Sequence, residues 1–158
     1  GISISEGQIS NIITKVMHKE LASEKQAIFE SGMNHASFVQ TDETGARHQG
    51  KNHYMHVICD PRFSCYFVKP DKKRETLKGI LGLGKEDRLK IPLITDDAKQ
   101  YYKLSEIDCL CWIHEIRHYI KLNPYLGYHK QILELFLNDL YEFYRFMKLY
   151  KINPNDNI

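Results

Sequence analysis

The sequence has no long apolar run: nowhere do hydrophobic residues continue for the roughly 20 positions that a membrane-spanning helix requires. Its first residues do not form a secretory signal either, because Glu6 interrupts the apolar stretch and no cleavage pattern follows. Internal repeats and low-complexity tracts are also missing. These absences exclude a membrane protein and a repeat protein, and they predict a cytoplasmic location with no membrane partner.

Net charge and cysteine content are both low. The 22 Lys and Arg residues and the 20 Asp and Glu residues leave a formal charge of +2, so a polyanionic partner finds support only in a local basic patch. The four cysteines lie in strand-like apolar runs, which predicts a reducing compartment and no disulfide framework. With 42% hydrophobic and 27% charged residues over 158 positions, the composition is that of one globular domain with a real core.

Apolar periodicity predicts a succession of helices and strands. Ser5 can cap a first helix, and a turn is expected after that helix at residues 31–34. A hairpin loop is expected at residues 45–52, which hold two glycines and an asparagine. The expected helices are 2–30, 70–81, 99–105 and 128–150, and the expected strands are 38–42, 54–59, 63–68 and 91–94, with 110–113 either a fifth strand or the start of a helix.

Two strand-like runs end on a carboxylate, Asp42 and Asp96. Strand ends are rigid mounts, and a few aspartates suffice for Mg²⁺, which prefers hard oxygen ligands and keeps several waters. Two such ions about 3.5–4 Å apart can neutralise the attacking and leaving oxygens of a phosphodiester. A ribonuclease-H-like nuclease core has this order of elements along the chain: a strand with an acidic residue, two further strands, a helix, and a second strand with an acidic residue. The alternative is that both aspartates only begin turns.

Several segments of the chain resemble transposases of the insertion sequence 66 type. The likeness begins in the lead-in to the catalytic domain of these transposases, continues through their first catalytic segment, and covers nearly the whole chain in the right order. The segments that carry it are 1–10 (GISISEGQIS), 42–47 (DETGAR), 50–52 (GKN), 54–59 (YMHVIC), 95–98 (TDDA), 110–115 (LCWIHE) and 117–119 (RHY).

The resemblance implies a DDE transposase of a mobile element, which cuts and joins DNA at transposon ends with Mg²⁺ or Mn²⁺ in the bacterial cytoplasm, on the nucleoid when bound to DNA. It implies an α/β fold: a ribonuclease-H-like mixed five-stranded sheet with flanking helices, after an N-terminal helix and before an all-helical insertion. By position, Asp42 is the first catalytic and metal-binding aspartate and Asp96 the second, with Asp97 as the nearest alternative to Asp96. Cys111 and His114 match the Cys-x-x-His element of such transposases.

The sequence departs from the family pattern at the third catalytic acidic residue. In the family this glutamate follows a helical insertion, and residues 155–157 (NDN) resemble its segment only superficially. We therefore expect a catalytic-core fragment that is inactive alone. The expected division is an N-terminal helical segment over 1–36, an incomplete ribonuclease-H-like core over 37–124, and the start of the insertion over 125–158. The apolar face of helix 128–150 needs a partner, and self-association through this C-terminal helix is one option.

A competing interpretation is a zinc-dependent hydrolase. His114-Glu115-x-x-His118 places two histidines on one face of a helix, where they could bind zinc while Glu115 activates a water. The third ligand would be His129, Glu134 or Glu142; a structural zinc would instead use Cys109, Cys111, His114 and His118.

Polar and basic residues near these motifs are candidates for contact with DNA phosphates. Arg47, Lys51 and Asn52 belong to the expected hairpin beside the first acid, and Arg117 and His118 follow the Cys-x-x-His element. The alternative is that these side chains only face solvent. A non-enzymatic remnant that only binds DNA is therefore a further hypothesis.

Overall fold

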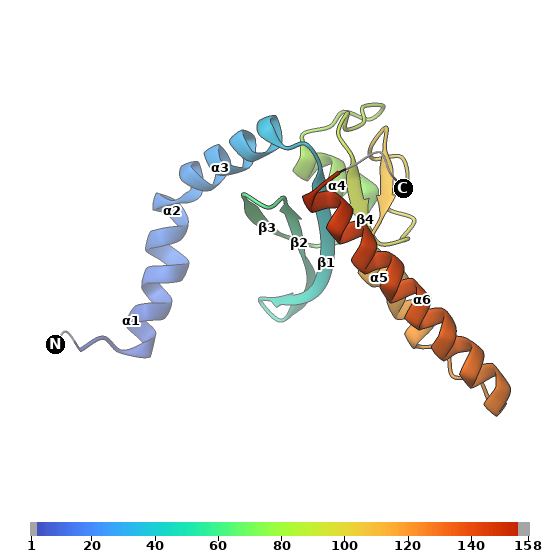
Figure 1. Cartoon of the computed structure of the whole chain (residues 1–158). Helices are drawn as coiled ribbons and strands as arrows, with labels where there is room; N and C mark the ends of the chain where they lie inside the picture. Colours follow the sequence, from blue (N-terminus) through green and yellow to red (C-terminus); the bar gives the residue numbers. More distant parts are fainter. Residues whose placement is uncertain (1–2, 155–158) are drawn as a thin grey trace. The chain divides into compact units, whose positions relative to one another are not determined.

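Five strands form one mixed sheet in the order β3-β2-β1-β4-β5 (Figure 1). β1 (Val39–His48), β2 (Lys51–Cys59) and β3 (Ser64–Lys69) form an antiparallel meander, and β4 (Leu93–Thr95) and β5 (Asp108–Leu110) continue the sheet parallel to β1. The structure is a computed structural model that describes residues 3–154, with His18 described by its backbone alone. The predicted α/β fold, a ribonuclease-H-like mixed five-stranded sheet with flanking helices, is confirmed.

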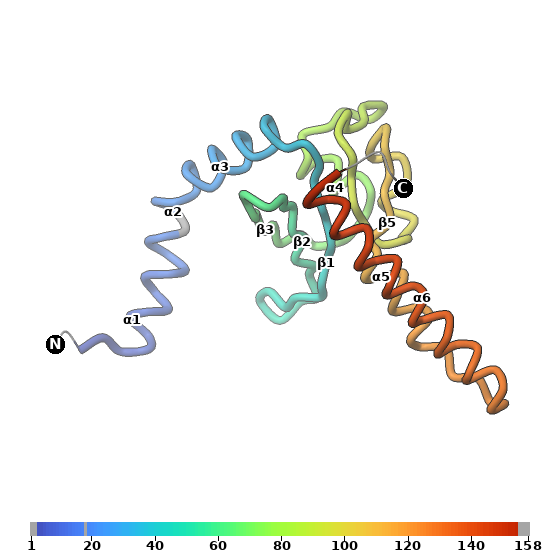
Figure 2. Tube along the Cα trace, viewed as in Figure 1, coloured from blue at the N-terminus to red at the C-terminus, as the bar shows by residue number. Residues whose placement is uncertain are grey.

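The β1–β2 hairpin is longer than the sequence predicts. Its turn consists of Gln49 and Gly50 alone, with φ angles of 49° and 75°, the positive values that a two-residue hairpin turn requires. Figure 2 traces the hairpin in cyan from β1 through this turn into β2. The predicted hairpin over residues 45–52 is confirmed, and strand pairing extends through most of this segment, because Gly45 already pairs with Tyr54.

One face of the sheet carries the core. Side chains alternate between the two faces of a strand, and the buried Val39, Ile58, Cys65 and Leu93 all lie on the same face. α4 (Arg74–Leu81) covers this face with an apolar stripe and ends at Gly82, whose φ of 69° suits a glycine at a helix C-terminus. The buried side chains of the stripe are Leu77, Ile80 and Leu81.

The N-terminal residues are helical, as predicted, but the helix is interrupted and ends later. The expected cap at Ser5 is confirmed: its hydroxyl accepts the N–H of Gln8, whose side chain in turn accepts the N–H of Ser5. The predicted turn at 31–34 is wrong, because α3 continues to His35. The helical elements are α1 (Glu6–Asn11), the π-helix η1 (Ile12–Met17), α2 (His18–Glu20) and α3 (Ala22–His35).

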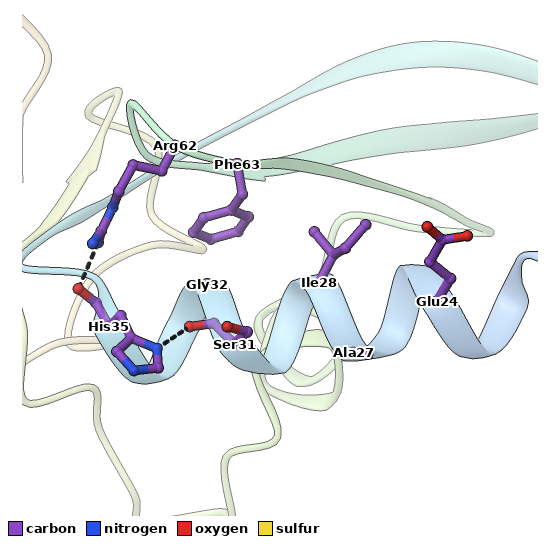
Figure 3. Close-up of a pocket in the computed structure, with 8 residues that line it drawn as sticks. All are labelled: Glu24, Ala27, Ile28, Ser31, Gly32, His35, Arg62 and Phe63. Carbon is purple, nitrogen blue, oxygen red and sulfur yellow. Dashed lines mark hydrogen bonds between the residues drawn. The ribbon is translucent and has the colours of Figure 1, made fainter.

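α3 is fixed to the core by aromatic contacts. The Phe29 ring packs edge-on against Phe63 and Phe67, with ring centroids 6.5 and 5.1 Å apart. Figure 3 shows the Phe63 ring facing Gly32, and the Arg62 guanidinium donating to the carbonyl oxygen of His35 at the end of the helix. α3 therefore shares one hydrophobic core with α4 and the sheet.

The segment between β4 and β5 forms turns where a short helix is expected over 99–105. Lys103 has a φ of 60°, which a right-handed helix does not accommodate. The Asp108 carboxylate accepts the N–H of Lys103 at 3.0 Å and that of Ser105 at 3.4 Å, which fixes the turn. The prediction of a helix here is wrong because these contacts replace helical hydrogen bonds.

The chain divides into two compact units, Gly1–Leu110 and Cys111–Ile158. The second unit holds α5 (Trp112–Ile120) and α6 (Gly127–Ile152), so the predicted helix over 128–150 is confirmed and residues 110–113 contain both the end of β5 and the start of α5. Tyr119 and Phe136 pack edge to face at 4.9 Å between the two helices. No helix in the described residues is long and apolar enough to cross a membrane. Residues 155–157, compared above with the family's third acidic segment, lie outside the described residues.

Candidate functional site

Asp42 and Asp96 belong to hydrogen-bonded neighbours in the sheet. β1 and β4 pair in parallel, with Val39 opposite Leu93 and Gln40 opposite Ile94. Two positions further along this register stand Asp42, inside the long strand β1, and Asp96, directly after the last residue of β4. Because neighbouring strands are about 4.8 Å apart, a parallel register of this kind brings two carboxylates to the same level of the sheet.

The two aspartates have different surroundings. Asp42 is exposed and lies between the core-facing Thr41 and Glu43, so the strand alternation directs it to the face opposite the core. Its Oδ1 accepts the N–H of Glu43 at 2.8 Å. Asp96 is half-buried, and its Oδ1 accepts the N–H of Ala98 at 3.0 Å. Asp96 therefore begins a turn, as the alternative interpretation expects, while its second carboxylate oxygen takes no part in that bond.

Asp97, the alternative to Asp96, makes a different contact. Its Oδ1 accepts the phenolic hydroxyl of Tyr102 at 2.7 Å. This hydrogen bond raises the pKa of Tyr102, and burial and the charges of Asp97 and Asp96 add to the effect.

Glu43 is an acidic residue at this site that the sequence interpretation missed. Its side chain is only 7% exposed, and its Oε1 accepts hydrogen bonds from Lys72 Nζ at 3.2 Å and from Gln100 Nε2 at 2.9 Å. Its Oε2 accepts the hydroxyl of Tyr101. The signal was present in the alternation of Val39, Thr41 and Glu43, which places a carboxylate on the buried face, where it must find partners.

Lys72 joins Glu43 to the surroundings of Asp96. The hydrogen bond and the charge of Glu43 raise the pKa of Lys72, the charges of Tyr54 and Asp96 contribute in the same direction, and burial opposes them. The Lys72 ammonium also lies 5.7 Å from the centre of the Tyr54 ring. The Lys72 ammonium therefore interacts electrostatically with both Glu43 and Asp96.

The candidate DNA contacts fall in both units. Arg47, Lys51 and Asn52 are exposed at the tip of the β1–β2 hairpin, where Arg47 pairs with Asn52. Arg117 and His118 are exposed on α5, in the second unit.

Cys111 and His114 begin the second unit. Cys111 is the N-cap residue of α5, and its carbonyl accepts the N–H of Glu115. His114 and His118 stand four residues apart on this helix, as the zinc interpretation requires. The carboxylate of Glu115, however, accepts the hydroxyl of Tyr119 at 2.6 Å.

The donors available favour magnesium over zinc. Within residues 3–154, no group of three or more His, Cys, Asp or Glu side chains is arranged to hold a metal ion. A zinc site needs three or four protein ligands, so the zinc-hydrolase and structural-zinc sets lack support in the described part of the chain. Magnesium binds through one or two carboxylates and retained waters, which two aspartates on neighbouring strands can satisfy.

A family model described as "Transposase IS66 family" matches residues 1–156, which is nearly the whole chain. No curated protein sequence matches the chain.

Proposed function

Because the chain belongs to the Transposase IS66 family, we propose that its sheet carries the first two carboxylates, Asp42 and Asp96, of a metal-dependent site for DNA strand cleavage and strand transfer. The observation that carries this proposal is the parallel pairing of β1 with β4. Both residues follow that pairing by two positions, one on each strand.

In this function, Asp42 and Asp96 hold Mg²⁺ or Mn²⁺ through carboxylate oxygens, the ligands that such hard cations prefer. When bound, the metal supplies charge neutralisation at the phosphate oxygens of DNA. The contribution of the chain is rigid placement: Asp42 pairs with Val57 of β2, and β1 also pairs with β4 up to Gln40, two residues before Asp42. The bond from the Ala98 N–H orients Asp96 at the end of β4.

The proposal includes DNA as the partner. Arg47, Lys51 and Asn52 on the hairpin and Arg117 and His118 on α5 contact its phosphates, and such contacts position a duplex without reading its sequence. Cys111 and His114 shape the start of α5.

We further propose the division of the chain into segments 1–36, 37–124 and 125–158, and activity in the bacterial cytoplasm.

We also propose that the 158-residue chain cleaves DNA slowly or not at all when alone. A transposase core of this type uses three acids, and the described residues hold no group of three potential ligands. Two carboxylates bind a divalent cation more weakly than three because each ligand adds to the affinity.

Titration with Mn²⁺, followed by electron paramagnetic resonance, tests this proposal. Asp42→Asn and Asp96→Asn each remove one negatively charged ligand, so each is expected to weaken Mn²⁺ binding at least tenfold, of the order that loss of a supporting group already causes at metal sites. Asp139→Asn, an exposed aspartate on α6, is the matched control and leaves the affinity unchanged.

Three results would separate the alternatives. If neither Asp42→Asn nor Asp96→Asn changes Mn²⁺ binding, the metal site is elsewhere and the proposed function is wrong. If purified protein instead retains stoichiometric zinc that His118→Ala releases, the zinc hydrolase gains support. DNA binding without any Mn²⁺ site at Asp42 and Asp96 would favour the non-enzymatic remnant.

A further inference from the structure

Glu43 links three separate segments of the first unit through one buried carboxylate. It stands on β1; Lys72 precedes α4, and Gln100 and Tyr101 follow β4. Tyr101 is itself only 2% exposed. Lys72 compensates the charge of the buried carboxylate, and two neutral donors form further hydrogen bonds with its oxygens.

Both segments bound by Glu43 are also anchored nearby. Arg74 Nη2 donates to the carbonyl oxygen of Lys99 at 3.0 Å, which joins the start of α4 to the turn after β4. On β2, the fully buried His56 lies opposite Glu43, and its Nε2 is 3.1 Å from the carbonyl oxygen of Asp71. The contacts around Glu43 therefore form a continuous network across the end of the core.

The network around Glu43 lies just beyond the point where the pairing of β1 with β4 ends. The pairing of β1 with β4 ends at Gln40 and Ile94, two residues before Asp96. Backbone hydrogen bonds between these strands thus do not reach Asp96, whereas Gln100 and Tyr101 tie the same loop back to β1 a few residues later.

We propose that Glu43 is a positioning residue, which clamps the loop after Asp96 to β1 so that Asp42 and Asp96 keep the separation needed to share a divalent cation. This inference rests on the proposed function. Strand alternation places Glu43 on the face opposite Asp42, and its oxygens accept hydrogen bonds from Lys72, Gln100 and Tyr101, so the role assigned to it is positioning and not binding of the cation.

Two measurements on the full chain test the inference: amide hydrogen exchange over residues 96–103, and Mn²⁺ affinity. Glu43→Gln and Tyr101→Phe are expected to speed exchange in this loop and to weaken Mn²⁺ binding about tenfold, as removal of outer hydrogen-bond partners does at other metal sites. Glu106→Gln, at an exposed glutamate between β4 and β5, is the matched control and changes neither quantity.

The experiments distinguish failure of the positioning role of Glu43 from failure of the proposed function. If wild type shows no Mn²⁺ site at Asp42 and Asp96 but Glu43→Gln loosens the loop, the proposed function is wrong and the clamp is structural only. Faster exchange with unchanged Mn²⁺ affinity would overturn the positioning role. Loss of Mn²⁺ binding without faster exchange would also overturn it, because Glu43 would then be a ligand.

The positioning role of Glu43 can still be tested if the Glu43→Gln variant misfolds. Tyr101→Phe deletes only the hydroxyl that contacts Glu43 and keeps the buried ring. If Glu43→Gln does not fold, Tyr101→Phe must still loosen the loop and weaken Mn²⁺ binding for the inference to stand. Where both fold, the double variant is expected to weaken Mn²⁺ binding by less than the two single effects combined, since both residues belong to one network.

Discussion

At Gly32, the absence of a side chain lets α3 approach the sheet. A Cβ placed there would lie 2.5 Å from the nearest atom of the Phe63 ring, which is closer than real contacts permit. Gly79 on α4 is the opposite case, because a Cβ there meets nothing within 4 Å. Two glycines inside helices therefore have different reasons for being there, and only the one at Gly32 is required by packing.

Substitution of these glycines by alanine should change stability in opposite directions. Gly32→Ala is expected to lower the free energy of unfolding by about 1–3 kcal/mol, because Phe63 must shift within the core. Gly79→Ala is expected to raise it by about 0.5–1 kcal/mol, since alanine costs less conformational entropy in an exposed helix. Urea denaturation measures both, and equal effects of the two substitutions would contradict the close approach at Gly32.

Among the elements, α4 shows how a side chain sets a helix boundary. The sequence predicts its start at residue 70, but α4 begins at Arg74. The Asp71 carboxylate accepts the N–H of Lys73 at 3.0 Å and the hydroxyl of Thr76 at 2.5 Å, which holds residues 71–73 outside the helix. The same short segment presents Lys72 to Glu43, so the delayed start of α4 contributes to the site.

The contacts of Asp71 predict a pH dependence of stability. The hydrogen bond from Thr76 is the largest cause that lowers the pKa of Asp71 below its ordinary value of 3.8, followed by the bond from the Lys73 N–H, and burial opposes them. A carboxyl group with a lowered pKa in the folded state stabilises the protein above its ordinary pKa, and this contribution is lost as pH falls through the folded value.

Asp71→Asn should therefore be less stable than wild type at pH 7, and the difference should shrink as pH falls below 3.8 and through the lowered pKa of Asp71 in the folded state. Thr76→Val, which removes the hydroxyl but keeps the shape of the side chain, should reduce the difference. Chemical denaturation over a pH series measures these changes. A difference that grows on acidification would contradict the assigned contacts.

For the whole molecule, the near-neutral net charge of +2 hides local clusters. The hairpin contributes Arg47 and Lys51, and α5 contributes Arg117, in separate compact units. DNA binding through these residues is a proposal, and self-association through α6 stays a prediction from the sequence. Both concern surfaces formed by exposed side chains, where burial gives no indication of a partner.

If DNA binds to both units, salt dependence reports the role of each basic residue. Removal of one side chain that binds a phosphate should reduce the slope of log K against log salt by about 1 and weaken binding to all sequences alike. We expect this for Lys51→Ala and for Arg117→Ala, measured by fluorescence anisotropy with duplex DNA. Lys130→Ala, an exposed lysine on α6, serves as control. An unchanged slope for Lys51→Ala and Arg117→Ala would exclude these residues from the interface.

Local patterns were sufficient to predict the succession of strands along the chain, the cap at Ser5, the end of α4 at Gly82 and the helix over 128–150, because periodicity and capping depend on residues a few positions apart. The network around Glu43 was not accessible in this way, since Lys72 and Tyr101 lie 29 and 58 residues from it. Local patterns also could not predict the close contact of Gly32 with Phe63 or the turns over 99–105. Contacts between distant segments fix these features, and such contacts exist only once the chain has folded. The metal-binding roles of Asp42 and Asp96 stay predictions, supported by the pairing of β1 with β4, which no local pattern could establish.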